Sequence, residues 1–176
     1  MSSAEMLRDT VLRLIMRDLQ AMQREIAAYP DDASLWTVPS GISNSGGTLA
    51  LHLSGNLRGF IGAMLGGSGY VRHRESEFAL RGLSRDVVIA ELVDAERQVI
   101  GALRALDLAT LDADFPIVVM ETTMSTGVFL LHLATHSAYH LGQVDYHRRL
   151  STGDGSTVKT ISIPAMVAPL PEVRAV

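Results

Sequence analysis

Hydrophobic side chains recur every three or four residues along four stretches of the chain, with polar and charged residues between them. This spacing gathers the hydrophobic side chains on one face of a helix. It predicts long amphipathic helices over four ranges, 4–28, 46–65, 84–107 and 124–150. Serine residues before three of these ranges can cap helix N-termini, and glycines after two of them suit helix ends.

The segments between the helices predict loops and short extended pieces. Residues 34–47 are rich in Ser, Gly and Asn, and residues 68–82 form a polar connection. The β-branched run 116–120 begins with proline and predicts an extended or strand-like segment. The tail, residues 154–176, contains three prolines and is expected to be extended. The four amphipathic helices predict an all-α fold, a four-helix bundle. Because the connections are mostly too long for tight hairpins, we expect at least one crossover connection in it.

Composition narrows the class of protein. The 176 residues and 47% hydrophobic content fit one globular domain that spans residues 1–176. The absence of cysteine excludes disulfides, thiolate metal sites and a cysteine nucleophile, and agrees with a reducing compartment. The net charge of −4 and the scattered basic residues argue against a nucleic-acid partner. We find no signal-peptide core and no bilayer-length hydrophobic run, so we expect a cytoplasmic protein without a membrane partner.

Three of the six histidines lie in one hydrophobic segment that belongs to the last predicted helix. His136 and His140 are one turn apart, ~6 Å along the axis, and can hold a single metal ion. His132 lies about 12 Å from His140 along the axis, too far for both to reach one ion through bonds of ~2.0–2.1 Å. At least one more ligand must therefore come from elsewhere in the chain.

His52 is the best candidate for that ligand because it lies in another hydrophobic helical segment. A lone histidine on such a face is usually a satisfied core residue, but a shared divalent cation would satisfy one nitrogen of each ring. His73 and His147 stand beside arginines and are expected to be solvent-exposed. The sequence therefore predicts a metal site formed by His52, His136 and His140.

Three motifs surround these histidines: His52-Leu53-x-Gly55-Asn56-Leu57-Arg58, Arg72-x-Arg74-x-x-Glu77-Phe78 and His136-Ser137-x-Tyr139-His140-x-Gly142-Gln143. Together they resemble the DinB-like superfamily, also called YfiT-like metalloenzymes, and the resemblance covers nearly the whole chain. It implies a divalent metal, nickel, zinc or iron, held by the three histidines with water in the open positions. Members of known activity include a mycothiol-dependent isomerase and bacillithiol S-transferases, and other relatives are called metal-dependent hydrolases.

A three-histidine site allows two reactions. Three neutral imidazoles leave the ion its full charge, so a bound thiol or water becomes more acidic. The thiolate of a low-molecular-weight thiol cosubstrate could attack an electrophile, or hydroxide could attack an ester or amide. We favour the thiol (S-) transferase, and keep the hydrolase and a non-catalytic metal- or ligand-binding dimer module as alternatives. The expected substrate is a small molecule, and a homodimer is left open.

Five further polar residues are candidates for supporting roles. Tyr139 could polarise a substrate oxygen and Gln143 could orient a ligand or water, although packing or a helix-to-helix hydrogen bond would also explain them. Asn56 and His132 could support the metal ligands from behind, and His132 could instead be a core residue or a proton carrier. Arg58 could anchor a substrate carboxylate through a bidentate bond, unless it is a solvated surface residue.

Overall fold

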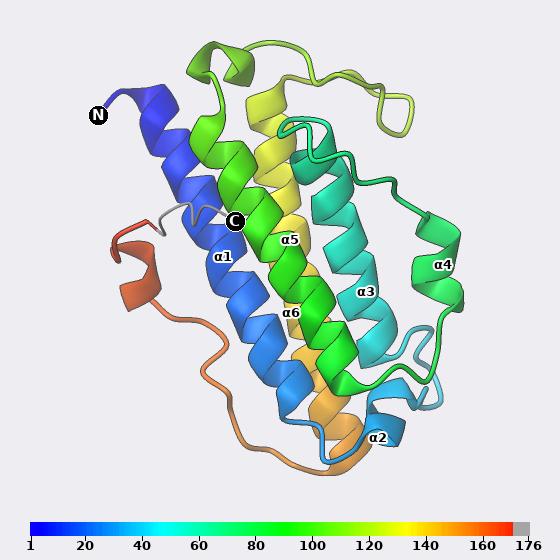
Figure 1. Cartoon of the computed structure of the whole chain (residues 1–176). Helices are drawn as coiled ribbons and strands as arrows, with labels where there is room; N and C mark the ends of the chain where they lie inside the picture. Colours follow the sequence, from blue (N-terminus) through cyan, green and yellow to red (C-terminus); the bar gives the residue numbers. More distant parts are fainter. Residues whose placement is uncertain (171–176) are drawn as a thin grey trace.

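The computed structural model describes residues 1–170, and these residues are helical without a β-strand (Figure 1). Four long helical segments lie side by side: α1 (Ser3–Ala27), α3 (Gly46–Leu57) continued by the π-helical turn η1 (Arg58–Ala63), α5 (Arg85–Ala105) and α6 (Thr126–Thr152). α1 packs mainly against α5 and α6, and α3 packs against the same two helices. The all-α class and the four expected long helices are therefore confirmed, with ends shifted by a few residues.

Local sequence signals explain where the long helices begin and end. Ser45, Ser84 and Ser125 each accept a hydrogen bond from the backbone N–H three residues later, as N-cap residues do. Ser2 begins α1 with a capping box. Gly153 ends α6 in the left-handed conformation, with φ of 71°, which glycine adopts at little cost.

The hydrophobic faces of the four long segments meet in one core. Core side chains with no exposed surface include Leu12, Ile15, Leu19, Met22, Leu53, Leu57, Leu92, Val99, Leu103, Leu130 and Val144. Burying each large aliphatic side chain stabilises the fold by about 1.5–3 kcal/mol. This shared core fixes how α3 faces α6, which positions the histidines.

Two short helices differ from the expected loops. α2 (Asp32–Trp36) and α4 (Arg74–Ala79) contain five and six residues. Elements of one or two turns are too short to repeat a hydrophobic face, so periodicity cannot reveal them. Both helices pack against α3, and the Trp36 Nε1–H donates to the Leu83 carbonyl oxygen at 2.8 Å.

The connection between α5 and α6 and the tail after α6 are irregular. The 3-10 helix η2 (Leu108–Leu111) follows α5. The expected extended run 116–120 is instead made of bends and a turn, with Met120 at a φ of 47° and an isolated bridge between Val119 and Thr122. The expected extended tail is interrupted by the 3-10 helix η3 (Pro164–Met166), which packs against α1. Its last residues, 171–176, lie outside the described part. No helix in that part combines the length and the hydrophobicity needed to cross a bilayer.

His147 is buried, so the expectation that it is solvent-exposed is wrong. The His147 Nε2–H donates to the Thr37 carbonyl oxygen at 2.8 Å, and Nδ1 accepts from the Tyr29 hydroxyl at 2.6 Å. Burial lowers the pKa of His147, which keeps the ring neutral in this network. Arginines flank His147 in the sequence, but successive helical residues are 100° apart, so the neighbours do not set its exposure.

A buried ion pair joins α6 to α1 and to the tail. The side chains of Arg148 and Glu25 have no exposed surface, and Arg148 Nε donates to Glu25 Oε2 at 2.6 Å. Arg148 also donates to the Ser156 carbonyl oxygen at 2.7 Å, and the Thr160 hydroxyl donates to Glu25 at 3.1 Å. The pair thus holds residues 156–160 against the helices.

We expect Arg148→Met to lower the free energy of unfolding by about 3–5 kcal/mol, because it leaves the Glu25 carboxylate buried without its partner. Urea unfolding followed by circular dichroism measures this loss. Arg149→Met is the matched control, since the neighbouring Arg149 is partly exposed in its pair with Asp145 and should cost less than about 1 kcal/mol. Equal losses in the two variants would contradict the assigned role of Arg148.

Candidate metal centre

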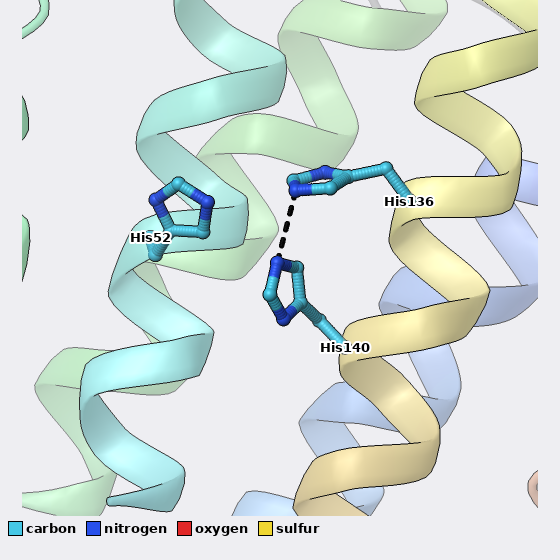
Figure 2. Close-up of side chains that lie close together, drawn as sticks. All are labelled: His52, His136 and His140. Carbon is cyan, nitrogen blue, oxygen red and sulfur yellow. Dashed lines mark hydrogen bonds between the residues drawn. The ribbon is translucent and has the colours of Figure 1, made fainter. Parts of the chain in front are cut away.

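Three histidine rings converge between α3 and α6 (Figure 2). One ring nitrogen from each of His52, His136 and His140 lies within 4.8 Å of the others. Bonds of ~2.0–2.1 Å to one ion require nitrogen separations of roughly 3–4 Å. The Nε2 atoms of His136 and His140 are already 2.9 Å apart. A shift of about an ångström or less would therefore let all three nitrogens bind one ion.

The two helices supply these histidines from facing surfaces. His52 is in the middle of α3 and is buried, while His136 and His140 are half-buried and lie one turn apart on α6. The ring of His52 stands edge-on to both partners, with centroids 5.4 Å and 5.1 Å away. The packing of α3 on α6 thus brings the three histidines together, which the sequence alone could not establish.

A carboxylate lies behind His52. Glu77 of α4 accepts a hydrogen bond from His52 Nδ1 at 2.9 Å, which leaves His52 Nε2 free of a proton and directed at the other rings. Arg72 donates to both oxygens of Glu77, at 2.7 Å and 2.8 Å. Hydrogen-bonded carboxylates behind metal-binding histidines fix the tautomer and orientation of the ring. Glu77 lies in the motif Arg72-x-Arg74-x-x-Glu77-Phe78, but the sequence alone does not predict its contact with His52.

Two glycines make room for this support. A Cβ atom on Gly55 would collide with the Glu77 carboxylate, and one on Gly59 would lie 3.0 Å from the Arg72 side chain. These glycines are four residues apart, so they share the side of α3 and η1 that faces α4. Glu77 and Arg72 can therefore approach the helix that carries His52 closely.

The side-chain amide of Gln143 holds His140. Because an amide oxygen can only accept, the 2.7 Å contact between His140 Nδ1 and Gln143 Oε1 places the proton on Nδ1. The ligand-orienting role expected of Gln143 stays a prediction, and this hydrogen bond is the contact that it would use. The third ligand differs, because His136 Nδ1 is buried without a hydrogen-bond partner among residues 1–170.

The electrostatic surroundings keep the rings of His136 and His140 neutral. Burial, with the nearby His140 and His52 rings, lowers the pKa of His136 to about 3. Burial also lowers the pKa of His140. At Glu77 burial opposes ionisation, but hydrogen bonds from Arg72 and His52 outweigh it and lower the pKa. Neutral imidazoles are the form that binds a metal, so the donor set fits a divalent cation.

The other candidates lie around this group. His132 is exposed and stacks on His136 with a centroid distance of 5.9 Å, so it is not a core residue. Tyr139 is 64% exposed beside His140, and its effect on a substrate oxygen stays a prediction. Asn56 is buried, one turn after His52. Arg58 already pairs with Glu91 and Asp94, so anchoring a substrate would require it to leave these carboxylates.

A family model described as "Protein of unknown function (DUF1572)" matches residues 3–166. The chain belongs to this family. DUF1572 lies in the DinB/YfiT-like family, which agrees with the resemblance carried by the three motifs. Comparison of this DUF1572 member with curated proteins and with solved structures gives no significant match.

We expect Gly55→Ala to weaken metal affinity about 10–100-fold, because the added methyl group displaces Glu77 from His52. Competition with a chromophoric zinc chelator measures the affinity. Gly101→Ala is the control, since a Cβ at this helical glycine meets no atom within 4 Å. If Gly55→Ala disturbs folding, Glu77→Gln tests the same contact without added volume, and unchanged zinc affinity in it would refute the role of Glu77.

The metal-free protein should lose stability as the pH falls below 6.5. The unfolded chain protonates His136 near its ordinary pKa, whereas the folded chain resists protonation until about pH 3. The unfolded state thus binds more protons in this window, and we expect His136 to contribute about 1–2 kcal/mol of the loss between pH 7.5 and 5. Urea unfolding with chelator, compared between wild type and His136→Gln, should show a shallower pH dependence in the variant. His73→Gln, at an exposed site, should leave the dependence unchanged.

Proposed function

We propose that this protein is a divalent-metal-dependent enzyme that transfers a low-molecular-weight thiol to a small electrophile, on a four-helix bundle of the DinB/YfiT-like type. The observation that carries the proposal is the convergence of three imidazoles from α3 and α6, with lowered pKa values at His136 and His140. A nickel, zinc or iron ion held there would act as a Lewis acid that lowers the pKa of a bound thiol. The protein itself has no cysteine, so the thiol would be a cosubstrate.

The number of ligands favours catalysis over a structural role. Structural zinc sites usually have four protein ligands, whereas catalytic sites have three and an open position. Within residues 1–170, the group that can hold an ion contains only the three histidines. This supports an enzyme over the alternative of a non-catalytic metal- or ligand-binding module.

The hydrogen bonding of Glu77 favours a thiol over water as the nucleophile. A hydrolase needs a general base near the site, but Glu77 bonds to both Arg72 and His52. Those bonds lower the pKa of Glu77, which makes it a weak base. A thiol ionises far more easily than water and has less need of a base. Metal-dependent hydrolysis is therefore the second candidate.

A cavity of about 550 Å³ beside Gln143 supports a small-molecule substrate. Its walls are the loop at residues 41–44 together with Leu49, Tyr146, Leu150 and the neutral ring of His147. These residues carry no charge, so the cavity suits the neutral, partly apolar portion of a ligand. Gln143 forms one wall and also bonds His140, so a ligand in the cavity would lie next to the metal centre.

We expect protein loaded with nickel, zinc or iron to conjugate a bromobimane electrophile to an added thiol, and His136→Ala to lower this rate at least about 100-fold. The variant loses one of the three ligands, so its bound metal should fall in parallel. Metal analysis and fluorescence of the conjugate measure the two effects. His73→Ala is the matched control, because this histidine is exposed.

Chromogenic esters separate the alternatives. Thiol-dependent conjugation without ester cleavage supports the transferase, and ester cleavage that needs no thiol supports the hydrolase. Metal-loaded protein that performs neither reaction across a panel of thiols and esters would support the non-catalytic module.

A further inference from the structure

Asn56 contains a buried polar atom that the fold leaves without a partner. The residue is 7% exposed, and its Oδ1 accepts no hydrogen bond within residues 1–170. Burying an unpaired polar atom costs about 1–3 kcal/mol, and a leucine of similar size would fill the space without this cost. Packing therefore does not explain the amide.

The position of Asn56 relates it to the metal centre. It follows His52 by four residues, so it lies one turn further along α3 and about 40° around the axis. Gly55 faces Glu77 of α4. Around the helix axis, Gly55 and Asn56 lie on opposite sides of His52, so Asn56 faces away from α4 and toward α6. α3 and α6 run in opposite directions (Figure 1), so this later turn of α3 faces the earlier of the two ligands on α6, His136.

His136 contains the complementary unpaired atom. Its Nδ1 is also buried without a partner in the described part of the chain. The other two ligands each have an acceptor behind them, Glu77 for His52 and Gln143 for His140. Metal-binding histidines nearly always donate their second ring N–H to such an acceptor. His136 is the ligand for which this acceptor has not been identified.

The hydrogen bonds between the rings set the tautomer that His136 has without metal. Gln143 places the His140 proton on Nδ1, so His140 Nε2 can only accept. The 2.9 Å contact between the two Nε2 atoms then requires His136 to carry its proton on Nε2. His136 Nδ1 therefore has no proton without metal, and it is not hydrogen-bonded to Asn56 Oδ1 in this structure.

We propose that Asn56 is the positioning residue for His136, and that its Oδ1 accepts the Nδ1–H of His136 when His136 Nε2 binds the metal. For Nε2 to bind, its proton must leave to solvent, and a proton from solvent enters at Nδ1. The ring is neutral before and after, so the exchange balances. The inference rests on the proposed function only in requiring a bound divalent ion.

The experiment compares Asn56→Leu, which removes the acceptor, with Asn56→Asp, which keeps an acceptor of the same shape. We expect Asn56→Leu to lower zinc affinity about 10–100-fold while metal-free stability stays equal or rises, and Asn56→Asp to hold zinc within a few-fold of wild type. Nitrogen-15 NMR of the histidine rings reads the tautomers directly. His136 should carry its proton on Nε2 without metal and on Nδ1 with zinc, and the Nδ1–H should exchange faster with solvent in Asn56→Leu.

Two outcomes would overturn the assignment: zinc affinity in Asn56→Leu equal to wild type, or a His136 Nδ1–H whose solvent exchange is unchanged in that variant. If Asn56→Leu does not fold, a His136 proton on Nδ1 in the metal-free wild type also overturns it. Zinc binding that depends on Asn56, without turnover of thiols or esters, would uphold this inference and reject the proposed enzyme. Protein that takes up no divalent ion would reject both.

Discussion

The candidate metal centre depends on the desolvation of three imidazoles between two facing helices. A protonated histidine is poorly solvated there, and each ring would repel the charge of the others, so the pKa of His136 falls to about 3. The rings of His136 and His140 therefore stay neutral, with lone pairs available in a small volume. At low pH this arrangement lowers the stability of the fold, because the unfolded chain can protonate these histidines and the folded chain resists it. Strongly shifted pKa values of this kind are more typical of binding sites than of a hydrophobic core.

Hydrogen-bond acceptors at the Nδ1 atoms of His52 and His140 orient these two rings toward the candidate metal centre. Glu77 and Gln143 place the protons of His52 and His140 on Nδ1, which points both Nε2 lone pairs at the middle of the group. The support reaches His52 from α4, a helix of six residues that approaches because Gly55 has no side chain. A short connecting helix is thus as much a part of the site as the long helices, and Arg72 holds it in place through Glu77.

Stability comes from elsewhere in the molecule. The core of α1, α3, α5 and α6 and the buried Arg148–Glu25 pair hold the helices and residues 156–160 together. The buried network at His147 uses both of its ring nitrogens for structure. This separation lets His136 keep one buried ring nitrogen, Nδ1, without a partner in the described part of the chain, a cost that the remaining contacts offset.

Periodicity, caps and a closing glycine determined the four long helices, because these signals act within one or two turns. The spacing of His136 and His140 likewise fixed that they share one face of α6. The proximity of His52 to this pair, by contrast, depends on how α3 packs on α6, and the sequence alone offered it only as a hypothesis. His147 and Glu77 show the same limit, since flanking arginines or a polar connection say nothing about which side chain turns inward. Burial and long-range contacts are set by the summed packing of all the helices, which no local pattern contains.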